Sequence, residues 1–226
     1  MKWFLALLSL VAVTAYGDPC TARGVSGLPI VEHPSAKNGD QLAVIVTGDG
    51  GWRRIDARIA ERLRSEGVSV VGFLTPDYFR SLRTPDESSC ALERTIRYYS
   101  DHWKRPSILL IGYSRGADVL PFMVSRLPAD LRPSIKVIAL LGLEPTIDFQ
   151  YRSKWHRQRP TTQYEVKPEV EKLRGLKILC VYGDKETDSL CPALDPALAS
   201  VMRVQGAHHF AGNYRELADT ILKAAR

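Results

Sequence analysis

The sequence has few of the features that mark membrane, metal-binding or nucleotide-binding proteins. Beyond its first fifteen residues, no stretch is apolar enough to span a bilayer. The phosphate-binding patterns GxxxxGK[ST] and GxGxxG are both missing. No cysteine or histidine cluster has the spacing of a zinc site, and there is no nucleic-acid-binding motif. We therefore expect no metal ion, no cofactor and no nucleic-acid partner.

The 226 residues also contain no internal repeat, no low-complexity tract and no sign of a second domain. Lys2 precedes an apolar run over residues 3–15, and Ala15-Tyr16-Gly17 places small residues where a signal peptidase cuts. An uncleaved anchor is the alternative. We predict an exported protein with a signal peptide at 1–17 and one folded domain at 18–226.

Only four cysteines occur, and all of them lie in the expected mature chain. Export to an oxidising compartment favours two disulfides, for which three pairings exist. We favour Cys180–Cys191, because it closes a short loop beside the end of an expected strand. The remaining pair is then Cys20–Cys90.

Strand patterns alternate with helical patterns along the chain, which predicts an α/β fold with a mostly parallel sheet and helices on both faces. Pro121 lies inside one expected helix, where it should kink the helix or cost about 3 kcal/mol. Apolar runs predict strands at 28–31, 41–47, 68–74, 107–112, 135–141, 176–182 and 200–205, and helices are expected at 53–66, 84–103, 114–127 and 214–225.

The most informative stretch is Gly112-Tyr113-Ser114-Arg115-Gly116, which follows a buried-strand pattern and opens a helical one. It fits G-x-S-x-G, in which a serine on a tight strand-to-helix turn serves as a nucleophile. Side chains at the two glycine positions would collide with the neighbouring strand and helix. This context favours a catalytic Ser114 over a chance match.

A serine nucleophile needs a base that a third group orients, and in this fold the order along the chain is serine, acid, histidine. The loop after 176–182 offers Asp188, Glu186 and Asp184 as the acid, in that order of preference. Asp188 is favoured because it lies close to Cys191. His208 and His209 follow the last expected strand, and we prefer His208 slightly.

The oxyanion hole requires two backbone N–H groups. We expect one from Arg115, just after the serine. We expect the other from Gly50 or Gly51, in the glycine-rich loop that follows the 41–47 strand.

Four segments together resemble the family of the bacterial virulence protein VirJ and the related C-terminal domain of AcvB. They are Gly48-Asp49-Gly50-Gly51-Trp52, Arg83-Thr84-Pro85, the run from Gly112 to Pro121, and Gly206-Ala207-His208-His209-Phe210. The resemblance implies a periplasmic α/β-hydrolase that frees lysine or alanine from aminoacyl-phosphatidylglycerol. It also connects the chain with components of type IV secretion.

The amino group of such a substrate needs a polar receiver. Asp49, Trp52, Asp77 and Tyr78 are the candidate substrate-binding residues, with Asp118 a further candidate for the amine. Two other interpretations of the function remain. One is a different serine esterase, lipase or thioesterase, and the other is a non-catalytic partner in a secretion assembly.

The net charge of +6 favours anionic partners such as a phospholipid surface, although a modest positive charge can simply keep a protein soluble. Within 143–175, basic and aromatic residues alternate, which is typical of a membrane contact and also of a solvated lid. They are Arg152, Lys154, Arg157, Arg159 and Lys167 with Phe149, Tyr151, Trp155 and Tyr164.

Overall fold

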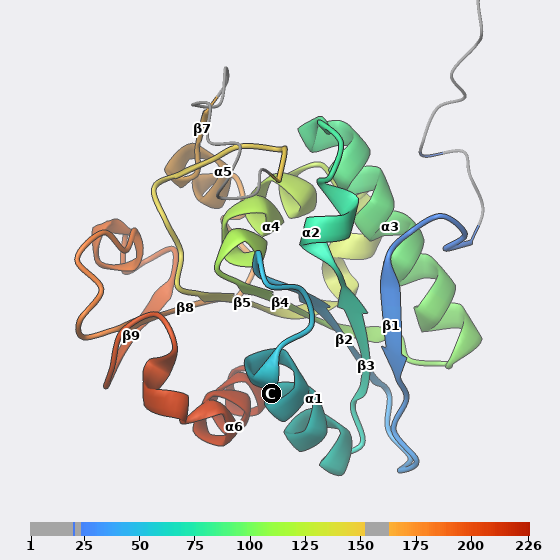
Figure 1. Ribbon diagram of the computed structural model, residues 1–226. Helices are drawn as coiled ribbons and strands as arrows, with labels where there is room; N and C mark the ends of the chain where they lie inside the picture. Colours follow the sequence, from blue (N-terminus) through green and yellow to red (C-terminus); the bar gives the residue numbers. More distant parts are fainter. Residues whose placement is uncertain (1–19, 21–23, 152–162) are drawn as a thin grey trace, which may run out of the picture.

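The computed structural model describes Cys20, residues 24–151 and residues 163–226. At its centre lies a seven-stranded sheet in the order β1-β3-β2-β4-β5-β8-β9 (Figure 1). β1 runs antiparallel to β3, and the other neighbours in the sheet run parallel. The strands are β1 (Ile30–His33), β2 (Gln41–Val46), β3 (Ser69–Phe73), β4 (Ser107–Tyr113), β5 (Ile135–Leu141), β8 (Ile178–Gly183) and β9 (Ser200–Val204).

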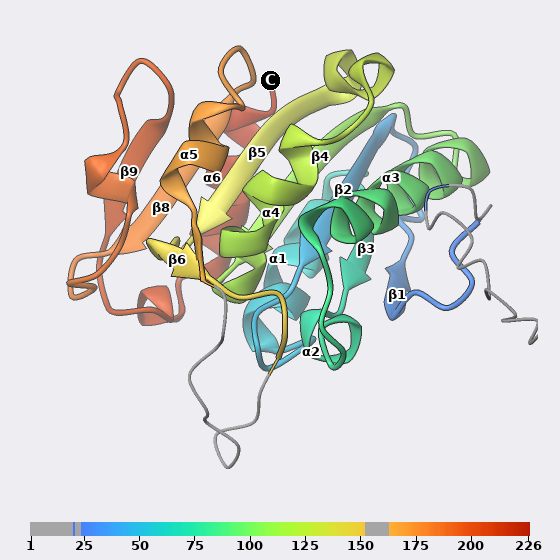
Figure 2. The same ribbon diagram turned by 90° about the horizontal axis from the view of Figure 1, so that it is seen from above.

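Helices cover both faces of this sheet (Figures 1 and 2). On one face lie α1 (Arg54–Ser65) and α6 (Tyr214–Ala224), which pack against each other. On the other face lie α3 (Pro85–His102), α4 (Arg115–Ser125) and α5 (Lys167–Glu171). The short helix α2 (Thr75–Tyr78) follows β3, and β6 (Thr146–Ile147) pairs with β7 (Tyr164–Glu165) in a separate ribbon.

The core consists of two apolar layers, one on each side of the sheet. Along β2 the side chains of Leu42 and Val44 face the layer under α3 and α4, whereas Ala43 and Ile45 face the layer over α1 and α6. Successive side chains of a strand point to opposite faces, so a strand covered on both sides must be apolar throughout. This requirement explains the continuous aliphatic runs in the sequence.

The predicted fold class is confirmed: the sheet is mostly parallel, with helices on both faces. Each predicted strand is present, although β1 and β8 each begin two residues later than predicted. Helix α4 remains helical through Pro121. Both predicted disulfides, Cys20–Cys90 and Cys180–Cys191, are present.

The predicted signal peptide at 1–17 lies outside the described residues. Across the parts of the chain that are described, none of the helices combines the length and apolar character that a bilayer crossing needs.

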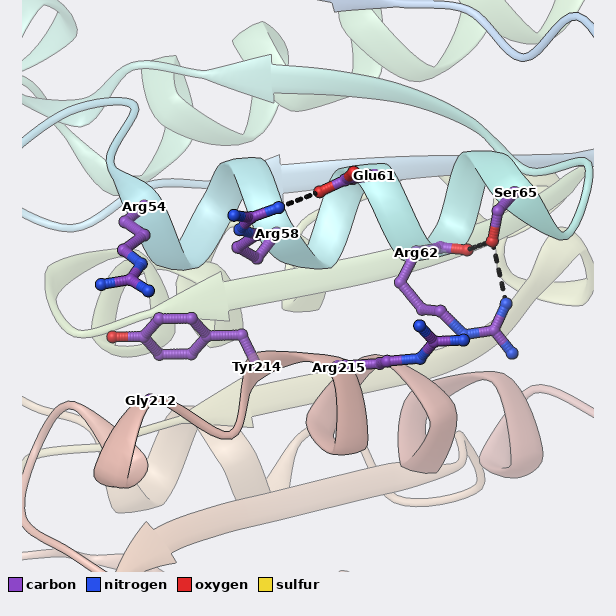
Figure 3. Close-up of a pocket in the computed structure, with 8 residues that line it drawn as sticks. All are labelled: Arg54, Arg58, Glu61, Arg62, Ser65, Gly212, Tyr214 and Arg215. Atoms are coloured by element: carbon purple, nitrogen blue, oxygen red, sulfur yellow. Dashed lines mark hydrogen bonds and ion pairs between the residues drawn. The ribbon is translucent and has the colours of Figure 1, made fainter.

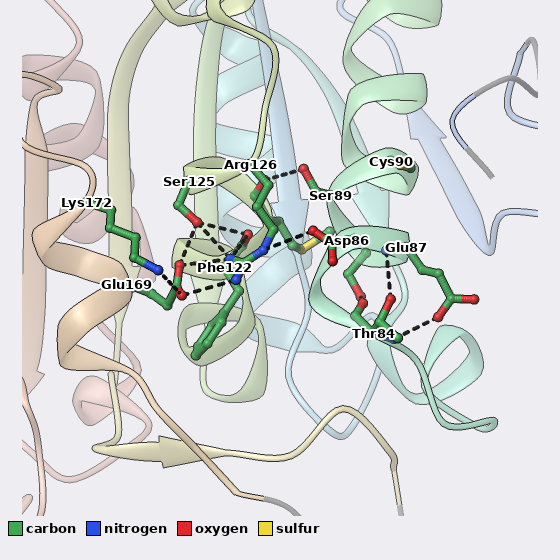
Figure 4. Close-up of polar contacts among 12 residues, drawn as sticks. Thr84, Asp86, Glu87, Ser89, Cys90, Phe122, Ser125, Arg126, Glu169 and Lys172 are labelled. Atoms are coloured by element: carbon green, nitrogen blue, oxygen red, sulfur yellow. Dashed lines mark hydrogen bonds and ion pairs between the residues drawn. The ribbon is translucent and has the colours of Figure 1, made fainter. Parts of the chain in front are cut away.

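A polar network joins the end of α4 to α3 and α5 (Figure 4). The buried carboxylate of Glu169 accepts hydrogen bonds from Ser125 (2.6 Å), Arg126 (2.9 Å) and Lys172 (2.7 Å). Arg126 also reaches Asp86 of α3 at 3.3 Å. Burial alone would raise the pKa of Glu169, but the bonds from Arg126, Lys172 and Ser125 outweigh it and lower this pKa.

We expect Glu169→Gln to lower the free energy of unfolding by about 1–3 kcal/mol at pH 7, because bonds to a carboxylate are lost. A lowered pKa in the folded state stabilises the protein above the pKa of the unfolded chain, and that contribution disappears as the pH falls through the folded-state pKa. Urea unfolding at pH 7 and pH 3 should therefore show a difference from wild type that shrinks in acid. The exposed Glu171→Gln on the same helix is the matched control. An equal effect of both variants would contradict this prediction.

Candidate active site

Ser114 stands on a sharp turn between β4 and α4. Its backbone has φ 54° and ψ −128°, in the left-handed region of φ that a residue with a side chain seldom adopts. A Cβ on Gly112 would lie 2.4 Å from the carbonyl oxygen of Gly116, and one on Gly116 would lie 1.9 Å from that of Val46 in β2. Both glycines of G-x-S-x-G are thus required by the close approach of backbone to backbone.

The loops after β8 and β9 meet at a pair formed by an acid and a histidine. Nδ1 of His208 lies 2.6 Å from Oε1 of Glu186. The other carboxylate oxygen of Glu186 accepts a hydrogen bond from the N–H of Gly183 at 2.6 Å. The carboxylate is therefore held from both sides, and it fixes the plane and the tautomer of the imidazole.

The His208 ring also lies beside the turn that carries Ser114. The N–H of Ser114 donates to the carbonyl of Leu141 at 2.9 Å, and a Cβ on the next residue, Gly142, would lie 2.8 Å from Cε1 of His208. The Ser114 hydroxyl makes no hydrogen bond to any described residue. Catalytic hydrogen bonds often form only once substrate is bound. Ser114, Glu186 and His208 thus occupy neighbouring positions at one edge of the sheet.

The preference for Asp188 as the partner of the histidine is wrong. Asp188 is exposed, and its carboxylate accepts a hydrogen bond from the Thr187 hydroxyl at 2.7 Å. Asp184 accepts one from the N–H of Gly206 at 2.8 Å, which ties the acidic loop to the histidine loop. The N–H of Glu186 donates to the carbonyl of Gly183. The turn formed in this way directs the Glu186 side chain, and not the aspartates, at the His208 ring.

The sequence did not decide between His208 and His209, and in the structure the two have different surroundings. His209 is exposed, and its Nδ1 lies 2.9 Å from the hydroxyl of Tyr113. The same hydroxyl donates to the backbone carbonyl of His208 at 3.2 Å. A hydroxyl has one hydrogen, so while it donates to that carbonyl it accepts from His209. Burial raises the pKa of Tyr113, so this hydroxyl stays protonated.

Tyr113 is thus a site residue that sequence reasoning missed. It occupies the first variable position of G-x-S-x-G, where the motif specifies no residue type. From the end of β4 it secures the backbone of the histidine loop. Phe210 is buried in the same loop, as its apolar side chain predicts.

Arg115, the residue after Ser114, connects two further loops. Its side chain is 12% exposed and forms ion pairs with Asp49 and with Asp148, the latter at 3.0 Å. Burial alone would lower the pKa of the guanidinium, but the two carboxylates outweigh it and raise this pKa. Asp49 therefore orders the loop after β2, and its charge is already balanced by Arg115.

The candidate backbone N–H donors of the oxyanion hole differ in whether they are already hydrogen-bonded. The N–H of Gly51 donates to the carbonyl of Gly48 at 3.0 Å, so in this conformation it is occupied, and our choice of Gly51 is corrected. The N–H groups of Asp49 and Gly50 donate to no described group. Arg115 is the first residue of α4, so its N–H has no partner within the helix.

Two of the predicted substrate-binding side chains are used in packing. The Trp52 ring stacks on His33 with centroids 4.6 Å apart, and it covers Gly72 of β3. Tyr78 is buried, and its hydroxyl donates to the Glu87 carbonyl at 3.0 Å. Burial raises the pKa of Tyr78 to about 12. The Tyr78 hydroxyl is thus already hydrogen-bonded, and the Trp52 ring is packed against the sheet.

The remaining acidic candidates also have partners. Asp77 is exposed and pairs with Arg80 at 2.5 Å. Asp118 is buried and accepts a hydrogen bond from the N–H of Glu144 at 2.7 Å. Burial raises the pKa of Asp118 well above its usual value, which favours the neutral acid and makes it a poor receiver for a cation.

The aromatic part of the 143–175 segment is partly described. Phe149 is buried and contacts Phe122 of α4, and Tyr164 contacts both rings. These two aromatics pack on the domain, as expected for a lid. Arg152, Lys154, Trp155, Arg157 and Arg159 lie outside the described residues.

The site chemistry therefore consists of a hydroxyl, an imidazole and a carboxylate. In the described ranges, no three histidine, cysteine, aspartate or glutamate side chains gather where they could hold a metal ion. An imidazole that a carboxylate orients beside a serine is the arrangement that removes the serine proton during acyl transfer.

Comparison with known proteins identifies the family of this chain. The family model described as bacterial virulence protein (VirJ) matches residues 40–226. The chain belongs to the VirJ family. No sequence among curated proteins matches this VirJ-family chain.

Solved structures share the fold of this VirJ-family chain at low sequence identity. Est1E from Butyrivibrio proteoclasticus has a TM-score of 0.62 and 13% identity, with 86% of this chain and 90% of that chain covered. XC6422 from Xanthomonas campestris, described as an a/b serine hydrolase without lid, has a TM-score of 0.55 and 17% identity, with 87% of each chain covered. The Pyrococcus furiosus esterase Pf2001 has a TM-score of 0.60 and 15% identity, with 87% and 89% covered. All three support an α/β-hydrolase fold.

We expect Gly142→Ala to displace the His208 ring, because the added Cβ would lie 2.8 Å from it. Gly175→Ala is a matched control, since both glycines have positive φ but nothing lies within 4 Å of a Cβ at 175. Long-range 1H–15N spectra of the imidazoles should show a changed His208 signal in Gly142→Ala only. An unchanged His208 signal in Gly142→Ala would show that the ring does not lie against this residue.

Proposed function

We propose that this VirJ-family protein is a periplasmic serine hydrolase that cleaves the aminoacyl ester of aminoacyl-phosphatidylglycerol and releases lysine or alanine. The observation that carries the proposal is the His208 imidazole, held by Glu186 at 2.6 Å beside the strained turn of Ser114. Membership of the VirJ family supports the substrate class. The shared fold with esterases supports the reaction type.

In the first half of the reaction, the Ser114 hydroxyl attacks the aminoacyl carbonyl carbon while Nε2 of His208 accepts its proton. Glu186 stabilises the imidazolium through Nδ1–H. The C–O bond to the glycerol then breaks, and the imidazolium returns the proton to the leaving glycerol oxygen. Phosphatidylglycerol departs, and the amino acid remains as an ester of Ser114.

In the second half, a water molecule attacks the acyl-enzyme and gives its proton to His208. Collapse of the intermediate returns that proton to Ser114 and frees the amino acid. In both halves, the N–H of Arg115 and the N–H of Gly50 or Asp49 stabilise the negative oxygen. Loss of one such donor typically costs about 100–1,000-fold in kcat.

Location and partners follow from the same proposal. Two disulfides suit an oxidising compartment, which supports export to the periplasm. The substrate is an anionic phospholipid at the membrane surface, and type IV secretion components are the proposed protein partners. A non-catalytic partner of a secretion assembly would not need a histidine that a carboxylate holds beside a strained serine. The presence of this arrangement therefore favours an enzyme.

The test is release of free amino acid from vesicles that contain lysyl- or alanyl-phosphatidylglycerol. We expect Ser114→Ala to lower kcat/KM by about 1,000-fold or more, and Glu186→Gln to lower it by about 100-fold or more. Asp188→Asn, in the same loop, should retain wild-type activity because Asp188 does not contact the ring.

Soluble p-nitrophenyl and thioester substrates measured in parallel separate the other hydrolases from the proposed one. Cleavage of those esters without release of amino acid from the lipids would refute the substrate assignment. Wild-type activity of Ser114→Ala in every assay would refute the proposal that the protein is a serine hydrolase.

A further inference from the structure

A cationic groove lies between α1 and α6, on the face of the sheet opposite α4 (Figures 1 and 3). Its cavity has a volume of about 430 Å³. Four arginines line it, three from α1 and one from α6: Arg54, Arg58, Arg62 and Arg215. Tyr214 lies at the end where both helices begin, and Arg54 points toward its ring (Figure 3).

The four arginines differ in how their charges are balanced. Arg58 pairs with Glu61 at 2.7 Å, and Arg62 pairs with Glu66 and Asp219. Arg54 and Arg215, by contrast, have no carboxylate or hydrogen-bond partner among the described residues. Two guanidinium groups thus remain unneutralised on facing helices.

These two arginines lie near the beginnings of their helices, which is electrostatically unfavourable when no ligand is bound. Arg54 is the first residue of α1, and Arg215 is the second of α6. The beginning of a helix carries a partial positive charge, so a cation there is unfavourable. Anionic groups bound along the groove would offset these unfavourable charges.

The groove begins next to the candidate active site. α1 follows the loop that carries Asp49 and Gly50, and α6 follows the loop that carries His208. Burial is the main cause of the raised pKa of Tyr113, and the electrostatic effect of Tyr214 adds to it. The end of the groove at Arg54 and Tyr214 therefore lies at the same edge of the protein as the reacting groups.

We propose that the groove binds a phosphate-ester anion, with Arg54 and Tyr214 at the end where both helices begin and Arg215 farther along the groove (Figure 3). The planar guanidinium forks of arginine match two phosphate oxygens at once. The cavity is larger than one phosphate needs, so it also accommodates the glycerol of an ester. Glycerophospholipid headgroups and soluble organic phosphates both carry this group.

This inference goes beyond the proposed function, because binding is measured with ligands that carry no aminoacyl ester. We would compare wild type with Arg54→Gln/Arg215→Gln. The control is Lys136→Gln/Lys177→Gln, which removes the same charge from the amino ends of β5 and β8, at the opposite edge of the sheet. The two probes are sn-glycerol 3-phosphate by calorimetry, and vesicles of phosphatidylcholine with and without phosphatidylglycerol by flotation.

We expect the arginine variant to bind at least one probe about tenfold more weakly than wild type, while the lysine variant binds like wild type. If only vesicle binding weakens, the ligand is a lipid headgroup. If only the binding of sn-glycerol 3-phosphate weakens, the ligand is a soluble organic phosphate. Weaker binding of both probes supports the site for either kind of ligand. Equal binding by wild type and the arginine variant, or equal losses in both double variants, would overturn the proposal. If the double variant does not fold, the single variants at these two exposed positions give the same comparison.

Discussion

The hydrogen bond between His208 and Glu186 is the interaction on which the rest of the site depends. It joins loops that leave two neighbouring parallel strands, β8 and β9. Two further bonds hold these loops in place, from the Gly183 N–H to Glu186 and from the Gly206 N–H to Asp184. The Cys180–Cys191 disulfide closes the loop that contains the glutamate. An imidazole that is held in this way needs little reorganisation when a proton has to move.

The sheet brings the serine to that imidazole. β4 and β5 pair in parallel up to Tyr113 and Leu141, so Ser114 and Gly142 leave the sheet side by side. A side chain at 142 would occupy the space of the His208 ring, and one at 116 would collide with β2. The ion pair between Arg115 and Asp49 then fixes the loop that faces the serine. Close approach of backbone segments thus places the Ser114 turn beside the His208 ring.

The fold could be predicted from the sequence because strands buried on both faces leave unbroken aliphatic runs, as in β2 and β4. The serine turn could be predicted because its glycines are a local steric requirement. The acid could not be chosen, since Asp184, Glu186 and Asp188 all follow the same strand. Which of them reaches the ring depends on how the turn at Gly183 folds. Arg54 and Arg215 are far apart in the sequence, so their shared groove becomes visible only when α1 packs against α6.

The most direct test of the central claim is to treat the protein with a fluorophosphonate and to map the modified residue by mass spectrometry. Such a reagent forms a covalent bond with a serine that a neighbouring base activates. Our account predicts one adduct, on Ser114, which is lost in His208→Gln and retained in His209→Gln. An adduct on another residue, or equal labelling of Ser114 in wild type and His208→Gln, would contradict it.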